Sequence, residues 1–245
     1  MSATLAPRRT DCRGVFAATA LFASSDRWTA QRLRGCLTEV SLPRGESLHR
    51  QGDLNDRLYV IARGRIKLSA ESGNGRSVIL AVLGAGEMLG EQSVFDDEPL
   101  CPATAVAVLD SRLFALHTRD LAAMLQQRPD LGVSLLGKVS RRLRHSYELH
   151  ADFAFQDIAG RMARVLLDLS ARFGVGRADG LYVNHGLTQL ELAQLIGSSR
   201  ETVNKTLSEF AGRGWLRIEA GGVLVRDVHR LRHRARRYAG APTAC

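Results

Sequence analysis

The spacing of apolar side chains predicts β-strands over residues 42–117. Apolar and polar positions alternate over residues 56–69 on both sides of Arg63 and Gly64, which predicts a β-hairpin turning at that pair. An apolar run at 78–83 ends at Gly84 and Gly86, and strand-like stretches follow at 103–108 and 112–116. Short strands separated by glycine turns favour an antiparallel roll over a parallel sheet.

From Thr118 onward the apolar spacing becomes helical. Residues 118–127 fit a short helix capped by Thr118, and residues 129–150 fit a longer helix with Pro129 in its first turn, where proline is tolerated. The apolar positions of the longer helix form one stripe: Leu131, Leu135, Leu136, Val139, Leu143 and Tyr147. Such a stripe suits a helix packed on its own barrel, and it equally suits a seam between two copies of the chain.

Residues beyond 152 predict a second, smaller domain. Its elements are an amphipathic helix at 158–173, a glycine-rich loop at 174–180, a short strand at 181–184, two helices, and a hairpin around Gly221 and Gly222. An arginine-rich segment follows at 226–237, where we expect a short helix capped by Asp227. This segment suits additional contacts to phosphates, and it equally suits a solvated surface.

The two helices of this domain are the most informative part of the sequence. Thr188 and Glu191 have the spacing of a capping box, which predicts that the first helix begins there. Leu192 and Ile196 then face inward, and Gly197 supplies a turn. Ser198 or Ser199 caps the second helix. Two helices joined by so short a turn are typical of a helix-turn-helix.

The second helix has one buried face and one polar face. Val203, Leu207 and Phe210 have the spacing of a buried face. The exposed face near its start carries Arg200, Glu201, Asn204 and Lys205. An arginine can contact guanine, a glutamate can accept from cytosine, and an asparagine can pair with adenine in the major groove. Ser199 and Thr202 are placed for phosphates, and we assign Thr188 and Gln189 to the same interface.

Glu201 favours sequence-specific binding over general attraction to DNA. An acidic side chain on a DNA-facing surface repels phosphates unless it contacts a base. The alternative is an ordinary helical hairpin with a solvated charged face. A second alternative function is a small-molecule-sensing module whose C-terminal domain contacts protein rather than DNA.

Composition agrees with a nucleic-acid partner and argues against other classes. The 245 residues carry a formal charge of +9, which favours a polyanion. Four scattered cysteines have no metal-binding spacing and suit a reducing cytoplasm. No apolar run approaches the roughly 18 residues of a membrane helix. No nucleophile elbow or phosphate-binding loop is present, so we expect no catalytic site, no metal site and no enzyme.

The N-terminal residues loosely resemble a signal peptide, with Arg8, Arg9 and Arg13 before a short apolar run. Asp11 and Cys12 interrupt that pattern, and no suitable cleavage site follows. We therefore expect residues 1–20 to be flexible and to lead into a helix capped near Ser25 or Asp26.

Both halves of the sequence resemble one known protein family. The helix-turn-helix closely resembles that of the Crp/Fnr transcription regulators, particularly in GSSRETVNK, and the N-terminal half resembles their cyclic-nucleotide-binding barrel in GESLHRQGD, DRLYVIARGRIKL and GEMLGEQSVF. The resemblance covers about residues 20–228. It implies an α+β protein with an antiparallel jelly-roll at 21–128, a dimerisation helix at 129–151, a winged helix-turn-helix at 152–228 and a basic tail at 229–245.

The resemblance also implies partners and contacts. A bacterial homodimer would bind double-stranded DNA and would work with RNA polymerase. Arg200, Glu201 and Lys205 fall on the family's three base-contacting positions. This implies a two-fold symmetric site with TGTGA-like half-sites.

The sequence departs from the family at the expected effector site. Nucleotide-binding members have Gly-Glu at the start of a short helix, followed about ten residues later by Arg-Ser or Arg-Thr. Here the effector positions are Gly90, Glu91, Gln92, Ser93, Cys101 and Pro102, so that cysteine and proline replace the Arg-Ser pair. Arg142 is either a replacement cation or a surface residue. Cyclic nucleotide is the candidate cofactor, and its usual binding mode is disfavoured. The domain would then sense another effector or none.

Overall fold

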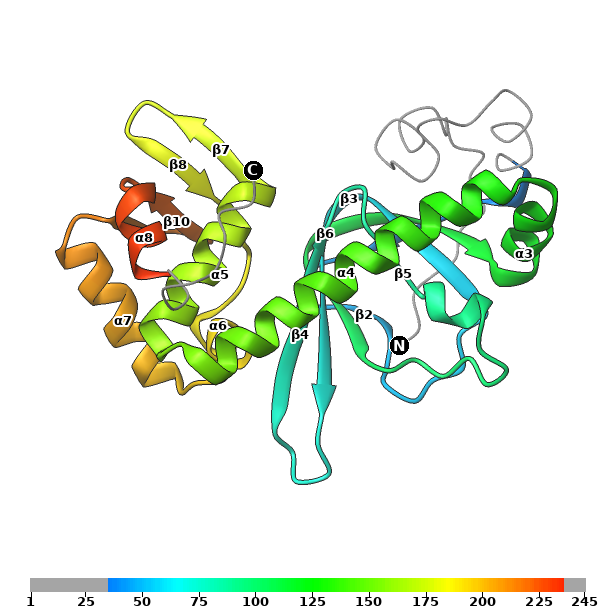
Figure 1. Ribbon diagram of the computed structural model, residues 1–245, viewed down its shortest axis with the longest axis horizontal. Coiled ribbons are helices and arrows are strands. Elements are labelled where there is room, and N and C mark those ends of the chain that lie inside the picture. Colours follow the sequence, from blue (N-terminus) through cyan, green and yellow to red (C-terminus); the bar gives the residue numbers. More distant parts are fainter. Residues whose placement is uncertain (1–34, 236–245) are drawn as a thin grey trace. The chain divides into compact units, whose positions relative to one another are not determined.

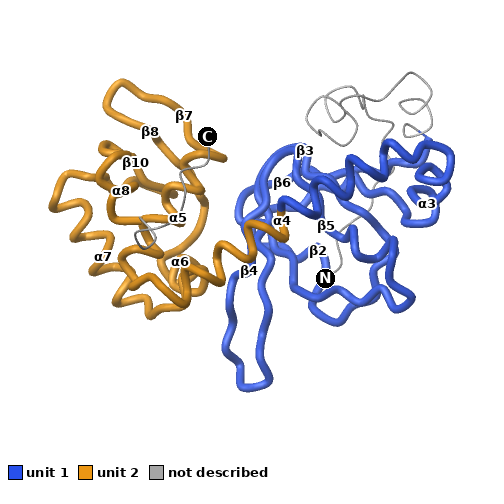
Figure 2. The backbone as a smooth tube through the Cα atoms, viewed as in Figure 1, with its two compact units in different colours: residues 1–141 blue, residues 142–245 orange. Residues whose placement is uncertain are grey.

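The computed structural model of the chain describes residues 35–235. They fall into two compact units, which divide between Arg141 and Arg142 (Figure 2). The expected flexible start at 1–20, the helix expected near Ser25 or Asp26, and the last ten residues of the basic tail lie outside the described residues.

The N-terminal unit is built on one antiparallel sheet (Figure 1). Its strands are β1 (Thr38–Leu42), β2 (Ser47–His49), β3 (Arg57–Glu71), β4 (Ser77–Gly84), β5 (Met88–Leu89) and β6 (Thr104–His117). The central order is β1-β6-β3-β4, with β2 paired to β6 and β5 paired to β3. The helices of this unit whose bounds lie within the described residues are the short 3-10 helix η1 (Glu91–Val94), α3 (Thr118–Gln127) and the first part of α4 (Pro129–Phe155).

The hairpin predicted at Arg63 and Gly64 is wrong. Residues 57–71 form one long strand, and the two short strands predicted at 103–108 and 112–116 are likewise the single strand β6. Gly64 has φ +94° and lies against the backbone and side chain of Ser111, where a Cβ atom would clash. The β3–β6 register shifts on both sides of Arg63. The glycine therefore marks an irregularity in a continuous strand rather than a turn.

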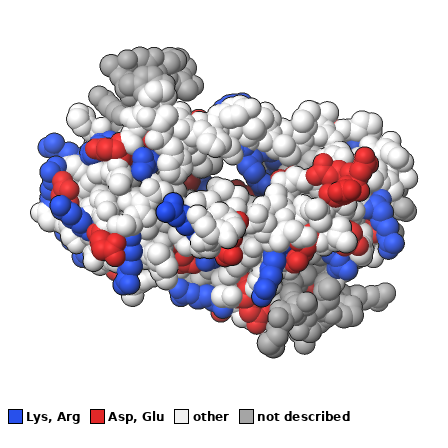
Figure 3. Space-filling model, turned by 90° about the horizontal axis from the view of Figure 1, so that it is seen from below, with Lys and Arg blue, Asp and Glu red and all other residues white. Residues whose placement is uncertain are grey.

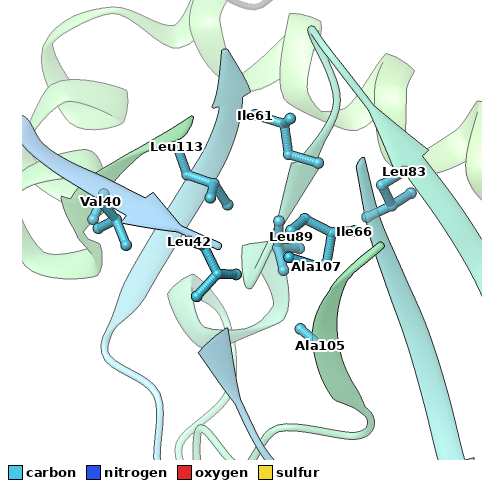
Figure 4. Close-up of a cluster of buried hydrophobic side chains, with 10 residues drawn as sticks. Val40, Leu42, Ile61, Ile66, Leu83, Leu89, Ala105, Ala107 and Leu113 are labelled. Atoms are coloured by element: carbon cyan, nitrogen blue, oxygen red, sulfur yellow. The ribbon is translucent and has the colours of Figure 1, made fainter. Parts of the chain in front are cut away.

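Two apolar clusters stabilise this unit. One lies inside the roll between opposing strands (Figure 4). Its buried members are Val40, Leu42, Ile61, Ile66, Leu83, Leu89, Ala105, Ala107, Leu113 and Ala115. The other joins the sheet to the helices, because Leu121 and Met124 of α3 and Leu131 and Leu135 of α4 share a buried cluster with Phe114 of β6.

Helices α3 and α4 differ in detail from the prediction. The N-cap of α3 is His117 and no side chain caps it, so the predicted Thr118 cap is wrong. The backbone N–H of Thr118 donates to the Asp56 carbonyl instead, at 2.9 Å. Helix α4 continues to Phe155, five residues beyond the predicted end at His150.

The predicted apolar stripe of α4 divides into two parts. Leu131 and Leu135 are buried in the core of the N-terminal unit, with Val139 packed against it. Leu136, Leu143 and Tyr147 are instead exposed, at 68%, 49% and 64% of their surface. Packing on the barrel therefore accounts for only half of the stripe.

The C-terminal unit combines helices with a small antiparallel sheet. Its helices are α5 (Ile158–Phe173), α6 (Gln189–Ile196), α7 (Arg200–Gly212) and α8 (Val228–Arg234), and its strands are β7 (Gly174–Arg177), β8 (Gly180–Val183), β9 (Leu216–Glu219) and β10 (Gly222–Val225). The sheet order is β7-β8-β10-β9. The loop predicted at 174–180 is wrong over its first part, because residues 174–177 pair with β8 as a hairpin.

Strand β8 is shifted by one residue from the predicted 181–184, and three other predictions in this unit are confirmed. Helix α5 has the predicted bounds, and β9 and β10 form the predicted hairpin. The Asp227 side chain caps α8 by accepting from the Arg230 N–H at 2.9 Å. Leu231 of α8 is fully buried, so this part of the arginine-rich segment packs into the domain rather than forming a solvated tail.

Candidate nucleic-acid interface

The first helix of the pair, α6, begins as predicted. The Thr188 hydroxyl accepts from the Glu191 N–H at 3.2 Å, and the Glu191 carboxylate accepts from the Thr188 N–H at 2.7 Å. This reciprocal pair satisfies two backbone donors that the helix would otherwise leave open. Leu192 and Ile196 are buried, which fixes the inner face of α6. Thr188 is exposed and Gln189 half-buried at the helix start.

The turn between α6 and α7 uses a left-handed glycine. Gly197 has φ 63° and ψ 54°, and its N–H donates to the Ala193 carbonyl. Next to it the Phe153 ring from the end of α4 is so close that a Cβ atom on Gly197 would lie 2.6 Å from the ring. Glycine is therefore needed at this turn for both its conformation and its size.

One guanidinium also bonds to the backbone of this turn. Arg161 of α5 donates from Nε to the Ile196 carbonyl at 2.9 Å and from Nη1 to the Gln156 carbonyl at 3.0 Å. Its Nη2 lies 3.5 Å from the Gly197 carbonyl, and the guanidinium carbon is 5.0 Å from the centre of the Phe153 ring. Arg161 thus ties the end of α4, the start of α5 and the helix-turn-helix turn together.

The second helix, α7, begins at the predicted cap. Of the two candidates, Ser199 is the N-cap, and its hydroxyl accepts from the Thr202 N–H at 3.2 Å. Val203, Leu207 and Phe210 are buried, as predicted, so the register of α7 is fixed by its apolar face. Phe210 also packs against Trp215 after the helix, with ring centres 5.1 Å apart.

The polar face of α7 is exposed where the prediction placed it. Arg200, Glu201, Asn204 and Lys205 are all exposed on the first turns of the helix, beside the exposed Ser199 and the half-buried Thr202. The pKa of Glu201 is lowered by its own backbone N–H and by the Ser199 hydroxyl, so the carboxylate is ionised at neutral pH. Cationic, anionic and amide groups therefore lie together at one helix end, which is the mixture that base edges require.

The sheet carries arginines that are engaged in pairs. Arg177 of β7 stacks on Tyr182, 3.7 Å from the ring centre, and pairs with Glu219 at 2.9 Å. Arg217 of β9 pairs with Asp179 at 3.2 Å and with Glu219. Basic and acidic side chains accordingly alternate over this unit, at the left of Figure 3.

The effector positions lie together in the N-terminal unit, apart from Arg142. Gly90 is the left-handed residue before η1, which carries Glu91, Gln92 and Ser93. The Asn55 amide donates to the Ser93 hydroxyl at 2.9 Å. Gly52 and Asp53, in the same loop as Asn55, form backbone hydrogen bonds with Cys101. Pro102 is exposed, and Arg142 belongs to the other compact unit.

Sequence reasoning missed Phe153 and Arg161. Arg161 bonds to Ile196, 35 positions along the chain, and Phe153 contacts the still more distant Gly197, whereas helical spacing describes only neighbours on one helix. The one local signal for this contact is Gly197: the sequence predicts a turn there, but it does not show that the Phe153 ring packs against it. Within residues 35–235, no group of three or more His, Cys, Asp or Glu side chains is placed to hold a metal ion. Over the same residues, no helix has the length and apolar character needed to cross a membrane.

Comparison with known proteins gives consistent matches for both units. Residues 39–128 match the cyclic nucleotide-binding domain family, and residues 160–234 match the Crp-like helix-turn-helix domain family. The chain is 41% identical over 200 residues to the CRP-like cAMP-activated global transcriptional regulator of Mycobacterium tuberculosis, covering 82% of this chain and 89% of that protein. It is 37% identical over 187 residues to the cyclic AMP receptor protein of Thermus thermophilus, covering 76% and 82%.

The solved structures agree with these relatives. A CRP/FNR-family transcriptional regulator from Thermus thermophilus has a TM-score of 0.67 and 28% identity, and the match covers 80% of this chain and 97% of that one. The predicted α+β architecture and the predicted resemblance are confirmed by these matches. No match favours the alternative of a C-terminal domain that contacts protein instead of DNA.

Proposed function

The chain belongs to the Crp/Fnr family of DNA-binding transcription regulators, and from this premise we propose how it contacts DNA and in what assembly. The proposal is that α7 enters the major groove and that Arg200, Glu201 and Lys205 contact base edges in TGTGA-like half-sites. The observation that supports this proposal is that cationic, anionic and amide side chains are exposed together on the first turns of α7, whose opposite face is buried. A recognition helix contacts base edges with such N-terminal side chains.

The neighbouring residues supply phosphate contacts in this proposal. Ser199 and Thr202 lie at the N-terminus of α7, where backbone N–H groups and the helix dipole favour an anion. Thr188 and Gln189 lie at the corresponding end of α6, and Asn204 is a second amide on the groove-facing side of α7. Phosphate contacts fix the position of the protein on DNA, and base contacts select the sequence.

Glu201→Ala tests the assignment of base contacts. The variant is titrated against a symmetric TGTGA-type duplex and against duplexes with each half-site base changed in turn. We expect lost discrimination of about 1–3 kcal/mol at one base pair, with other positions unchanged. Glu209→Ala is the control, because Glu209 is exposed on the same helix two turns away and pairs with Arg213 at 2.7 Å. Unchanged base preference in Glu201→Ala refutes the assignment.

We also propose that the protein acts as a homodimer through α4. The exposed apolar residues Val133, Leu136, Leu143 and Tyr147 have spacings of three, seven and four residues. With Ser140 between them, they occupy successive a and d positions of a heptad, which is the pattern of a helix that pairs with another helix. A second copy of α4 is the natural occupant, because a two-fold symmetric DNA site needs a two-fold symmetric protein.

The seam is tested by Leu136→Gln combined with Leu143→Gln. Sedimentation of the double variant should show monomers at concentrations where the natural chain is a dimer. Arg141→Gln is the matched control, since Arg141 is an exposed residue of α4 away from the a and d positions. A dimer that survives the double variant would place the interface elsewhere. In this role the dimer works in the cytoplasm, with RNA polymerase as its partner on DNA.

A further inference from the structure

We infer that the β-roll of this chain does not hold a cyclic nucleotide in the manner of its family, and that DNA binding therefore does not require cyclic AMP. The second half of this inference rests on the proposed function, and the first half concerns the N-terminal unit alone. A cyclic nucleotide carries a phosphate anion, which in a protein site needs a cation and hydrogen-bond donors. The residues at the phosphate positions supply neither.

The backbone at the phosphate positions is already used within the chain. The Cys101 N–H donates to the Asp53 carbonyl at 2.8 Å, and the Cys101 carbonyl accepts from the Gly52 N–H at 2.8 Å. Pro102, the next residue, has no N–H to offer. Asn55 extends the same pairing, since its N–H donates to the Pro99 carbonyl at 2.8 Å. The segment is thus closed on the loop at 52–55 by its own backbone hydrogen bonds.

The side chain at the arginine position is uncharged. Cys101 is 5% exposed, and burial, followed by the nearby Asp53 carboxylate, raises its pKa to about 11. At neutral pH it is a thiol, which is a weak donor and carries no charge to balance a phosphate. Replacing a guanidinium by this group removes a charge-assisted contact.

The segment of sequence that contains this position is acidic. Residues 77–111 contain no Lys, Arg or His, and they include six acidic residues: Glu87, Glu91, Asp96, Asp97, Glu98 and Asp110. Glu91 itself is buried, at 5% exposure. Figure 3 shows acidic side chains gathered on one part of the N-terminal unit, at the right of the view. The Asp53 carboxylate, which helps to raise the pKa of Cys101, adds a negative charge next to this position and disfavours a phosphate there.

Two cations of the N-terminal unit are engaged with other groups. Arg57 of β3, whose carbonyl accepts from the Asn55 amide at 2.7 Å, has its guanidinium 3.5 Å from Asp56. Lys138 of α4 donates to the Gly86 carbonyl at 3.4 Å. Gly90 and Glu91 keep the residue types of the family's motif at the start of η1, so the departure from the motif lies at positions 101 and 102.

The inference is tested by titrating the full chain with cyclic AMP in a calorimeter. We expect no saturable binding up to about millimolar nucleotide. The variant Cys101→Arg with Pro102→Ser restores the cation and a backbone donor. We expect it to gain about tenfold to a hundredfold in affinity, which brings saturable binding into the concentration range where the natural chain shows none. Cys101→Met with Pro102→Ser is the control, because it has a side chain of comparable length without charge and should not gain binding.

A second titration separates this inference from the proposed function. The affinity of the natural chain for the TGTGA-type duplex is measured with and without cyclic AMP, and we expect equal values. If no DNA binding is found and the calorimeter also shows no nucleotide binding, the proposed function is wrong while the β-roll inference holds. Saturable cyclic AMP binding by the natural chain overturns the inference, and this result does not depend on whether the arginine variant folds.

Discussion

The turn of the helix-turn-helix provides the sharpest test of the packing described above. Gly197→Ala places a methyl group on a left-handed residue, with φ 63°, and 2.6 Å from the Phe153 ring. The left-handed conformation costs a non-glycine residue roughly 1–2 kcal/mol. Forcing a methyl group into a packed contact adds about 1–3 kcal/mol. We therefore expect the substitution to lower the free energy of unfolding of the C-terminal domain by about 2–5 kcal/mol.

Two further variants separate these two costs. Gly214 is also left-handed, with φ 75°, but a methyl group on it would meet no heavy atom within 4 Å beyond its chain neighbours. Gly214→Ala should therefore show only the conformational cost of roughly 1–2 kcal/mol. Adding Gly197→Ala to a Phe153→Ala background should cost the same roughly 1–2 kcal/mol, because the ring is gone.

Urea unfolding followed by tryptophan fluorescence measures these differences. The chain has two tryptophans, so a Trp28→Phe background leaves Trp215, which packs on Phe210 of the recognition helix, as the single probe. Equal destabilisation by Gly197→Ala and Gly214→Ala would refute the tight contact between Phe153 and the turn. A penalty that persists undiminished in the Phe153→Ala background would refute it as well.

Two smaller predictions concern helix ends in the same domain. Thr188→Ala removes the acceptor of the capping box and should destabilise the domain by about 1 kcal/mol, measured by the same urea unfolding; no change would mean that the cap contributes nothing. Asp157 caps α5 and pairs with Arg234 at 2.5 Å, and chiefly this pairing lowers the pKa of Asp157. A lowered pKa stabilises the fold above the unfolded value of 3.8, and the stabilisation is lost as pH falls through the folded pKa. Asp157→Asn keeps the cap but not the charge, so its deficit against the natural chain should be present at neutral pH and disappear as the pH falls below the folded pKa of Asp157. A deficit that is independent of pH would contradict this account.

The parts of the fold that local chemistry determines were predictable. The capping box at Thr188 and Glu191, the Ser199 cap and the buried face of α7 each depend on residues within a few positions of one another. Such patterns remain visible in a single sequence, because helical periodicity and caps are local. The proposed DNA interface follows from these local patterns, because fixing which residues of α7 are buried also fixes which residues are exposed.

The errors occurred where distant residues decide the local structure. Gly64 resembles a turn residue, and only its contact with Ser111 on the paired strand shows that β3 continues through it. The stripe on α4 was ambiguous for the same reason, because the spacing could not show which half the barrel would cover. The hydrogen bonds of Arg161 go to backbone carbonyls in two separate segments, and no local sequence pattern predicts them.

The most direct test of the central claim is the affinity of the full chain for two duplexes without added nucleotide. Fluorescence anisotropy compares a symmetric duplex with two TGTGA-type half-sites and the same duplex with both half-sites shuffled, at one fixed salt concentration. The account predicts two chains per duplex and binding about a thousandfold tighter to the symmetric site. Equal affinity for the two duplexes would contradict sequence-specific recognition by α7.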